Sequence, residues 1–360
     1  MAGKHRHPFL STSYRIFATA MCVLLLLSYV SVLIDPAILP FAGFFGLYYI
    51  PVLAINVLLL VISLLRWSSS AWIPVIGILP SLLFLGYFFR SGDKDAVPEQ
   101  VVANTPGLTI LTYNVGGFRS GTGTSEANKA GVRSLIGEKS PDVVLMQEFR
   151  TADTSAISGM FPGYPYVYGQ FYRLRNGEYV GNVTLSRLPV SDVGRMDFTL
   201  STNMVLYTDI DVGNRKVRMY NVHLESNNIS LTALIKKIGG GYDSFSQELV
   251  EVHEKVRKSS TKRGGQVRAL LGNISESGLP SIICGDVNDT PMSYCFRSLK
   301  DGRKDTFREA GKGFGATYRV LWPLLRIDYI FVPDDVLVLG HRTPRPEFSD
   351  HYPVFAKVRI

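Results

Sequence analysis

Residues 283–291 read ICGDVNDTP, and this stretch decides how the larger part of the chain is interpreted. An apolar run ends at Gly285 and is followed by Asp286, Asn288 and Asp289. A strand needs only Gly, Asn or Asp to turn into a loop, so these residues alone are equally consistent with a polar loop. The question is whether other apolar strands end in acceptor groups as well.

The same arrangement recurs between residues 108 and 360. Apolar strands that end in polar side chains are predicted at LTILTYN with Asn114, DVVLMQE with Glu148, KVRMYNVH with His223, and LPSIICGD with Asp286 followed by Asn288. Two later strands reverse the order, since Asp328 opens one and Asp350 and His351 precede the other. If these two run antiparallel to the first four, all the polar groups meet on one rim of the fold. The sequence therefore predicts a polar site held by rigid strands.

The side chains of this rim favour a hard divalent cation. Carboxylate and amide oxygens suit Mg²⁺, Mn²⁺ or Ca²⁺ better than Zn²⁺, and several carboxylates on one rim repel each other without a cation. The chain has three cysteines and lacks C-x-x-C, H-E-x-x-H, G-x-S-x-G and P-loop motifs. Zinc, redox, serine-hydrolase and P-loop chemistry are therefore not predicted.

The N-terminal ninety residues have a different composition. The chain is 46% hydrophobic with a mean hydropathy of +0.13, which is too apolar for an ordinary soluble protein of this charge. Three uncharged runs predict transmembrane helices at about 15–34, 41–65 and 71–89. A signal peptide would not explain the second and third runs, and a core helix would show a polar stripe. Residues 1–90 are predicted to be an anchor in a lipid bilayer.

Positive charge gives the predicted orientation. Four cations lie on the side of the N-terminal tail and two on the other: Lys4, Arg6, Arg15 and Arg66, against Arg90 and Lys94. The bias favours a cytoplasmic N-terminus and places the rest of the chain outside the cytoplasm, with the anchor in a bacterial inner or plasma membrane. Residues 91–107 are predicted to be a linker, and 108–360 are long enough for one large α/β domain.

Six motifs carry a resemblance to a known family. TYNV, QE, NVHL, GDVND, RIDYIF and SDHYPV, in this order, resemble the endonuclease/exonuclease/phosphatase (DNase I-like) superfamily, here as a membrane-anchored, bacterial-type member. That superfamily includes nucleases, inositol-polyphosphate 5-phosphatases and neutral sphingomyelinases. The resemblance covers about 108–360 and implies a four-layer α/β sandwich, in which helices flank two mixed β-sheets. It also implies a hydrolase of phosphate esters that depends on Mg²⁺ or Mn²⁺.

The resemblance implies a metal site at three positions. Glu148 matches the principal metal ligand, and Asn114 and Asp350 match residues near the same ion or its waters. Some nucleases of the superfamily carry an acidic residue two positions after the first Asn, where this chain has Gly116. One carboxylate of the metal shell is thus missing, which weakens the transfer of a two-ion scheme.

Catalytic roles are implied at five further positions. Asp286 matches the residue that aligns or deprotonates the attacking water, and Asn288 matches a ligand of a phosphate oxygen. His351 matches the histidine that contacts the scissile phosphate, with Asp328 orienting it, and His223 matches the histidine that assists the leaving oxygen. Together the eight residues meet the needs of phosphodiester cleavage, which are a positioned water, charge neutralisation and help for the leaving group.

The substrate stays open at this point. The first hypothesis is a phosphodiesterase acting on nucleic acid or nucleotides, the second acts on lipid or inositol headgroups, and the third is a catalytically silent binding domain. Residues 229–268 are predicted to be a basic helical insertion with a hinge at Gly239–Gly241. This insertion is consistent with nucleic-acid binding, with lipid binding or with a solvated helix face. His253 and His341 match no motif and are predicted to lie on the surface.

Overall fold

The structure is a computed structural model that describes residues 8–91, 105–199, 201–227, 229 and 242–360. Its α-helices are α1 (Pro8–Ser31), α2 (Ala42–Leu47), α3 (Tyr49–Leu65), α4 (Trp72–Ile78), α6 (Ser125–Lys139), α7 (Ile157–Met160), α9 (Tyr242–Ser277), α10 (Tyr294–Lys300) and α11 (Thr306–Ala310). Short 3₁₀ helices are η1 (Ser69–Ala71), η2 (Leu79–Leu83), η3 (Leu85–Tyr87), η4 (Gly116–Phe118) and η5 (Arg319–Leu321).

Strands begin just after the anchor and continue to the C-terminus. They are β1 (Phe89–Arg90), β2 (Leu108–Asn114), β3 (Val143–Thr151), β4 (Tyr166–Arg173), β5 (Tyr179–Ser186), β6 (Val190–Asp197), β7 (Met204–Val212), β8 (Arg215–His223), β9 (Ser281–Asp286), β10 (Arg303–Asp305), β11 (Gly313–Phe314), β12 (Asp328–Pro333), β13 (Leu337–Arg342) and β14 (Val354–Arg359).

Two six-stranded mixed sheets form the centre of the catalytic domain. One has the order β13-β14-β2-β3-β5-β4 and the other β10-β12-β9-β8-β7-β6. Aliphatic side chains of both sheets share one buried cluster, to which Ile110 and Leu145 contribute from the first sheet and Met219, Ile282 and Ile330 from the second. The sheets therefore pack face to face, as the sequence predicts.

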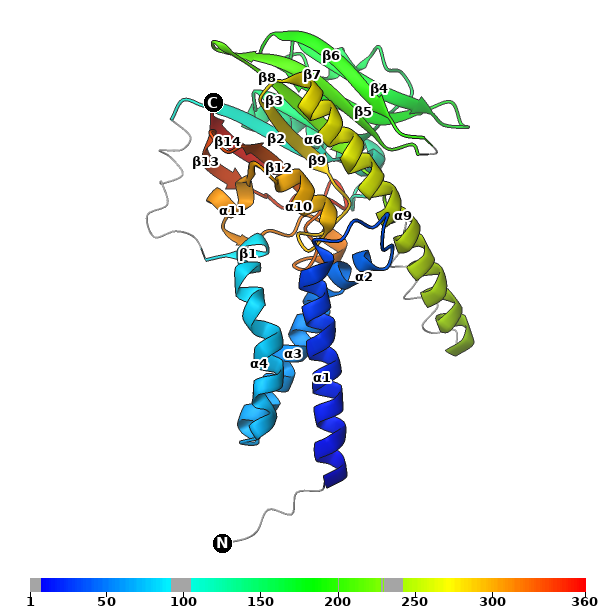
Figure 1. The fold of residues 1–360 in the computed structure, drawn as a ribbon. Coiled ribbons are helices and arrows are strands. Elements are labelled where there is room, and N and C mark those ends of the chain that lie inside the picture. The colour runs from blue at the N-terminus through cyan, green and yellow to red at the C-terminus, as the bar shows by residue number, and fades with distance from the viewer. Residues whose placement is uncertain (1–7, 92–104, 200, 228, 230–241) are drawn as a thin grey trace.

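Helices cover the outer faces of both sheets (Figure 1). On the first sheet, α6 buries Val132 and Ile136 against β2 and β3. On the second, α9 and α10 bury Val267, Leu270 and Phe296 against β8, β9 and β12. The predicted arrangement of two mixed sheets flanked by helices is confirmed.

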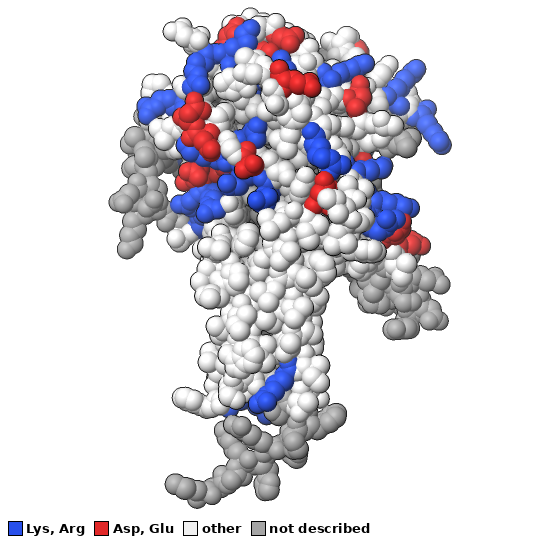
Figure 2. Space-filling view, viewed as in Figure 1, with Lys and Arg blue, Asp and Glu red and all other residues white. Residues whose placement is uncertain are grey.

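The N-terminal helices project from the catalytic domain as a stalk of α1, α3 and α4 (Figure 1). Large apolar side chains cover its outer surface, including Ile16, Leu65 and Leu83, which are 67%, 76% and 73% exposed. Figure 2 shows this surface as almost free of charged residues, in contrast to the catalytic domain above it. Such a continuous exposed apolar surface is unusual for a protein in water.

The prediction of three membrane-spanning helices is wrong in its helix count. Among the described residues one helix has the length and composition to cross a membrane, Thr12–Ser31, and most of its residues are not buried. The apolar helices Tyr49–Leu65 and Ser69–Leu83 are shorter than the predicted spans 41–65 and 71–89.

Prolines explain both shorter helices. The ring of Pro51 conflicts with a helical carbonyl four residues earlier, at Leu47, where α2 ends before α3 begins. In the third apolar run Pro80 has no N–H to donate, and α4 gives way there to the tighter η2 and η3.

The anchor and the catalytic domain are packed against each other. Arg326 donates from Nη1 to the Tyr87 carbonyl at 3.2 Å, and β1 pairs with β11. Asp35, just beyond α1, forms an ion pair with Arg268 of α9. On α2 the Gly46 carbonyl accepts a hydrogen bond from Thr290 Oγ1 at 3.4 Å. The loop that follows Asp286 is thus seated on the anchor.

Several smaller predictions have mixed outcomes. The basic insertion is helical in its second part, where α9 runs without a break from Tyr242 to Ser277, while the hinge at Gly239–Gly241 lies outside the described residues. Most of the predicted linker 91–107 also lies outside them. His253 is exposed as predicted. His341 is buried beside Thr306 Oγ1, so its assignment to the surface is wrong.

Candidate active site

The register of the sheets brings the predicted strand ends together. In the second sheet Asp286 of β9 lies opposite both Asp328 of the antiparallel β12 and His223 of the parallel β8. A Cβ on Gly285 would lie 2.0 Å from the carbonyl oxygen of Val222, so only glycine allows β8 and β9 to approach this closely before the rim. In the first sheet β2 and β3 are parallel, and Asn114 at the end of β2 lies opposite Gln147, while β3 continues past Glu148 to Thr151.

Two of the predicted residues have strained backbones. Glu148 has a φ of 52° and Asn288 has a φ of 55°. Glu148 lies in the β-bulge of β3, where the pairing with β5 shifts register between Met146 and Phe149. A bulge redirects side chains at the edge of a site, and left-handed φ values in non-glycine residues cluster where geometry serves function.

The amide of Asn114 lies between two carboxylates, and His223 lies beside both of them. Asn114 Nδ2 donates to Glu148 Oε1 at 3.1 Å and to Asp286 Oδ2 at 2.9 Å, which joins the two sheets across the rim. His223 Nε2 lies 3.5 Å from Glu148 Oε1 and 3.9 Å from Asp286 Oδ2. It is buried without a hydrogen-bond partner among the described residues. An imidazole nitrogen in this position is available to a substrate oxygen.

These donors fit a hard divalent cation. Two carboxylates from different sheets converge on one point, which a partly positive amide group occupies in this structure. The two carboxylates repel each other unless a positive group lies between them. Their oxygens are ligands of the kind that Mg²⁺ and Mn²⁺ prefer. The Glu148 side chain is 39% exposed, so an ion can reach it from solvent.

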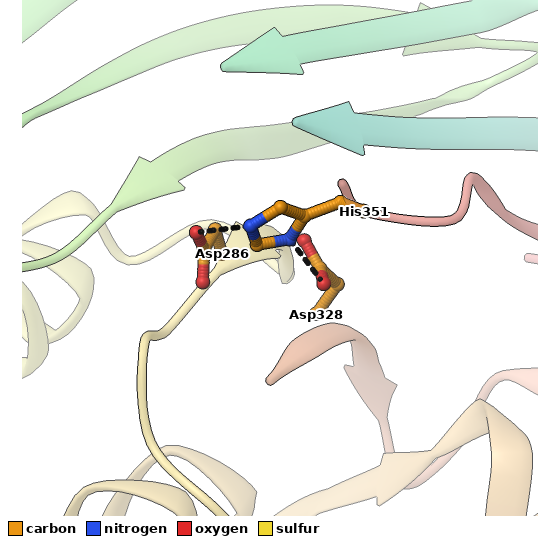
Figure 3. A group of neighbouring side chains, drawn as sticks. All are labelled: Asp286, Asp328 and His351. Atoms are coloured by element: carbon orange, nitrogen blue, oxygen red, sulfur yellow. Dashed lines mark hydrogen bonds and ion pairs between the residues drawn. The ribbon is translucent and has the colours of Figure 1, made fainter. Parts of the chain in front are cut away.

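A second group consists of Asp286, Asp328 and His351 (Figure 3). His351 Nδ1 lies 2.9 Å from Asp328 Oδ2, and its Nε2 lies 3.8 Å from Asp286 Oδ2. Burial lowers the pKa of His351, but the charges of Asp328 and Asp286 outweigh it and raise the pKa to about 10. The raised pKa favours the protonated imidazole, so His351 and Asp328 form a buried charged pair beside Asp286.

Asp286 has the environment of a general base. Its side chain is 1% exposed, and burial together with the charge of Asp328 raises its pKa to about 6, against the opposing effect of His351 and His223. A carboxylate of this pKa is ionised at neutral pH and still basic enough to accept a proton from water.

Asp350 reaches the same rim from the loop before β14. Ser349 Oγ lies 2.8 Å from the Asn114 carbonyl oxygen and 3.3 Å from Asp350 Oδ1. At Gly116 an added Cβ would lie 2.9 Å from Asp350 Oδ1 and 1.7 Å from Ser120 Oγ. The space that an acidic side chain would need at Gly116 is thus filled by Ser120 and Asp350.

Asn288 is held by its own loop. Its backbone N–H donates to Asp286 Oδ1 at 2.8 Å, and its Nδ2 donates to the Leu224 carbonyl at 2.9 Å and to Asp286 Oδ2 at 3.2 Å. These bonds fix the carboxylate of Asp286 and tie the end of β8 to that of β9. Binding of a phosphate oxygen by Asn288 remains a prediction.

Two supporting residues were not predicted from the sequence. The Tyr318 ring packs edge-on against His351 at 5.3 Å, and Thr317 Oγ1 accepts the backbone N–H of Asp328 at 3.1 Å. Both follow a glycine-rich turn whose pattern gives no sign of a role at the rim.

A buried polar network behind the rim does have a sequence signal. Asn221 donates from Nδ2 to the carbonyls of Met146 and Val183, at 3.2 and 3.0 Å, and its Oδ1 accepts from Gln147 Nε2 at 2.8 Å. An amide side chain in the middle of an apolar strand is the pattern that indicates such a network. These bonds hold the two sheets together directly behind Glu148.

Comparison with known proteins agrees with this geometry. The model of the endonuclease/exonuclease/phosphatase family matches residues 111–351, which is more than half of the chain. A domain of unknown function matches residues 11–88, within the anchor. No curated protein matches the chain.

Solved structures share the fold at low identity. An endonuclease/exonuclease/phosphatase from Beutenbergia cavernae is 19% identical with a TM-score of 0.53, over 71% of this chain and 72% of that one. A family protein from Leptotrichia buccalis is 16% identical with a TM-score of 0.52, over 70% and 100%. TDP2 of D. rerio, complexed with single-strand DNA product, is 17% identical with a TM-score of 0.52, over 71% and 100%.

Proposed function

This chain belongs to the endonuclease/exonuclease/phosphatase family of phosphoester hydrolases, and we propose that it is a membrane-tethered, divalent-metal-dependent phosphodiesterase. The observation that carries the proposal is the convergence of Asn114, Glu148, Asp286 and His223 at one rim, beside the buried ion pair of His351 and Asp328. A silent binding domain would not need the strained backbone of Glu148 or a buried carboxylate of raised pKa.

Each side chain has a defined task in the proposed reaction. Asp286 orients the attacking water and accepts its proton. The His351 cation binds a non-bridging phosphate oxygen and offsets the negative charge that grows there, while Asp328 fixes its orientation. His223 Nε2, which has no hydrogen-bond partner among the residues that the structure describes, donates to the leaving oxygen on the opposite side of the phosphorus.

Glu148, Asn114 and Asp350 would hold Mg²⁺ or Mn²⁺. A bound ion supplies charge neutralisation at the phosphate oxygens. The Asn114 amide donates to the carboxylates of both Glu148 and Asp286, which holds the two carboxylates at one point of the rim.

The stalk supports a tether in a lipid bilayer. The helix Thr12–Ser31 is 20 residues long, and the face of the stalk drawn in Figure 2 carries few charged residues. An α-helix rises about 1.5 Å per residue, so 20 residues span about 30 Å, which matches the hydrocarbon thickness of a bilayer. The cations Arg15 and Arg66 then lie at the cytoplasmic end, and the catalytic domain lies outside the cytoplasm.

For the substrate we propose the phosphodiester bonds of nucleic acid or nucleotides, to which a net charge of +8 is favourable. One observation favours lipid headgroups as the alternative. Thr290, four residues after Asp286, is hydrogen-bonded to Gly46 of the anchor. Four residues span at most about 14 Å, so the attacking water lies near the anchor and within reach of a headgroup.

The test is hydrolysis by the full-length chain in detergent with Mg²⁺, against plasmid DNA, RNA, dinucleotides, a bis-aryl phosphodiester, sphingomyelin and phosphatidylinositol. We expect Asp286→Asn to reduce kcat by about 10²- to 10⁴-fold and EDTA to abolish turnover reversibly. Asp334→Asn, at the exposed far end of β12, is the matched control and should leave kcat unchanged. Equal activity of Asp286→Asn and the control would refute the assignment of the site.

A further inference from the structure

A cavity of about 390 Å³ lies where the stalk meets the catalytic domain. Its lining includes Tyr29 of α1, Val32 and Leu33 just after α1, and residues of α10. In Figure 1, α10 lies above the upper end of α1. The cavity is distinct from the rim that carries Asp286, although Pro291 of the following loop lines it.

Aromatic side chains make the inner part of the cavity apolar and rigid. Phe84 stacks on Tyr29 with ring centroids 5.5 Å apart, and Tyr87 packs edge-on against Phe296 at 5.2 Å. All four rings line the cavity. Aromatic walls of this kind bind hydrocarbon chains well, because they make dispersion contacts with the chain and bind water only weakly.

The outer part of the cavity carries positive charge. Arg297 and Lys300, in the last turn of α10, both line it. Neither forms an ion pair or a side-chain hydrogen bond with any residue that the structure describes. Arg297 is exposed and Lys300 is half-buried, and Asp301 contributes one opposing carboxylate. The lining therefore has a net positive charge with two unused cations beside an apolar interior.

We propose that this cavity binds one anionic phospholipid of the surrounding bilayer. Its phosphate would pair with Arg297 and Lys300, and its acyl chains would lie along α1 between Tyr29 and Leu33. The position fits because Leu33 follows the membrane-length helix directly and its side chain is 57% exposed. This inference rests on the proposed membrane tether, because only a bilayer brings headgroups to this height on α1.

The lipid would also join the two parts of the molecule. It would contact α1 on one side and α10 on the other, and it would touch Pro291, three residues beyond Asn288. A soluble phosphate compound of the same charge would leave the aromatic wall uncovered. The acyl chain therefore distinguishes this proposal from a site for free phosphate.

The test uses the full-length chain in nanodiscs and measures lipid retention by native mass spectrometry, with phosphatidylglycerol against phosphatidylcholine. We expect wild-type protein to retain one phosphatidylglycerol preferentially, and Arg297→Ala/Lys300→Ala to bind it roughly thirtyfold more weakly. Arg297→Lys keeps the charge and should retain most of the affinity. Lys139→Ala, at the end of α6, is the control for an exposed cation of the catalytic domain and should behave as wild type.

Two results would overturn the proposal. Equal retention by the double variant and the Lys139→Ala control would mean that Arg297 and Lys300 do not bind the headgroup. Retention of inorganic phosphate as strongly as phosphatidylglycerol would mean that the apolar wall is not used. If the wild-type chain fails to enter nanodiscs, the tether fails and the lipid site fails with it, while hydrolysis by the rim is judged separately in detergent.

Discussion

Replacement of Gly46 by alanine tests whether the anchor sets the geometry of the active site. Gly46 lies in α2, far from Asp286 in sequence. An added Cβ would lie 1.9 Å from the carbonyl oxygen of Met292, whereas ordinary contacts of this kind begin at about 3.4 Å. Either α2 or the loop between Asp286 and Met292 must therefore move by more than 1 Å.

The loop is the part whose movement affects catalysis. Asn288 holds both oxygens of Asp286, and Thr290 Oγ1 is hydrogen-bonded to the Gly46 carbonyl, so a push at Met292 is transmitted to the carboxylate within a few residues. A misplacement of about 1 Å costs on the order of 10²-fold in rate, and overpacking of this kind costs about 1–3 kcal/mol of stability.

The assay compares kcat and melting temperature of full-length Gly46→Ala with those of Gly86→Ala, which adds the same methyl group to the anchor at a position with nothing within 4 Å. We expect Gly46→Ala to lose about 10²-fold in kcat on a bis-aryl phosphodiester, and Gly86→Ala to lose little. A lowered melting temperature with unchanged kcat would show that α2 yields instead of the loop. Wild-type values for both quantities would refute the proposed coupling.

Three further substitutions have distinct expected results. Asp328→Asn removes the charge that raises the pKa of His351 to about 10, so the pKa falls and kcat should drop at least tenfold more at pH 8 than at pH 6 in a pH–rate profile. Arg326→Met leaves the buried carboxylate of Asp305 unpaired and should cost about 3–5 kcal/mol, measured by thermal and chemical unfolding. Asn221→Leu leaves two buried carbonyls without donors behind the rim, and should lower both the melting temperature and kcat.

Each of these three substitutions has a control or an outcome that would contradict it. The ion pair of His351 stabilises the fold fully below about pH 6.5 and loses its effect as the pH rises through about 10, so parallel pH profiles of Asp328→Asn and wild type would contradict it. Arg195→Met breaks an exposed pair and should cost less than about 1 kcal/mol. Thr208→Val removes a buried hydroxyl that has no partner among the described residues, and a larger loss there than in Asn221→Leu would contradict the network.

Most strand ends were predictable from the sequence because the signals for them are local. A run of apolar residues indicates the strand, and the glycine or polar residues that follow indicate its end. The apolar run that breaks at Gly285 indicates both a buried strand and the place where its polar residues emerge. The antiparallel direction of β12 and β14 follows from the position of Asp328 and His351 before their strands rather than after them. Most of the sandwich could therefore be anticipated, although β3 continues past the predicted strand end at Glu148 to Thr151, and the roles of the eight candidate residues stay predictions.

Other features depend on contacts between distant segments and have no local signal. Tyr318 becomes a neighbour of His351 only through the path of the chain after β11. The burial of His341 depends on α11, which packs beside β13. In residues 1–90, hydropathy predicts where the apolar runs lie, but it does not predict that Pro51 ends α2 at Leu47. The lengths of the second and third predicted helices were therefore overestimated, because backbone geometry rather than composition determines where these helices end.

The anchor is more than an attachment, because it completes the core of the catalytic domain. Met292 is fully buried in a cluster with Leu25, Val32 and Tyr49 of the stalk, and Tyr87 belongs to the cluster that covers the second sheet. Separation of the two parts would expose these apolar groups and remove the support of the loop after Asp286. The N-terminal helices thus support the loop that follows Asp286, and the position of this loop beside residues 1–90 follows from the same packing.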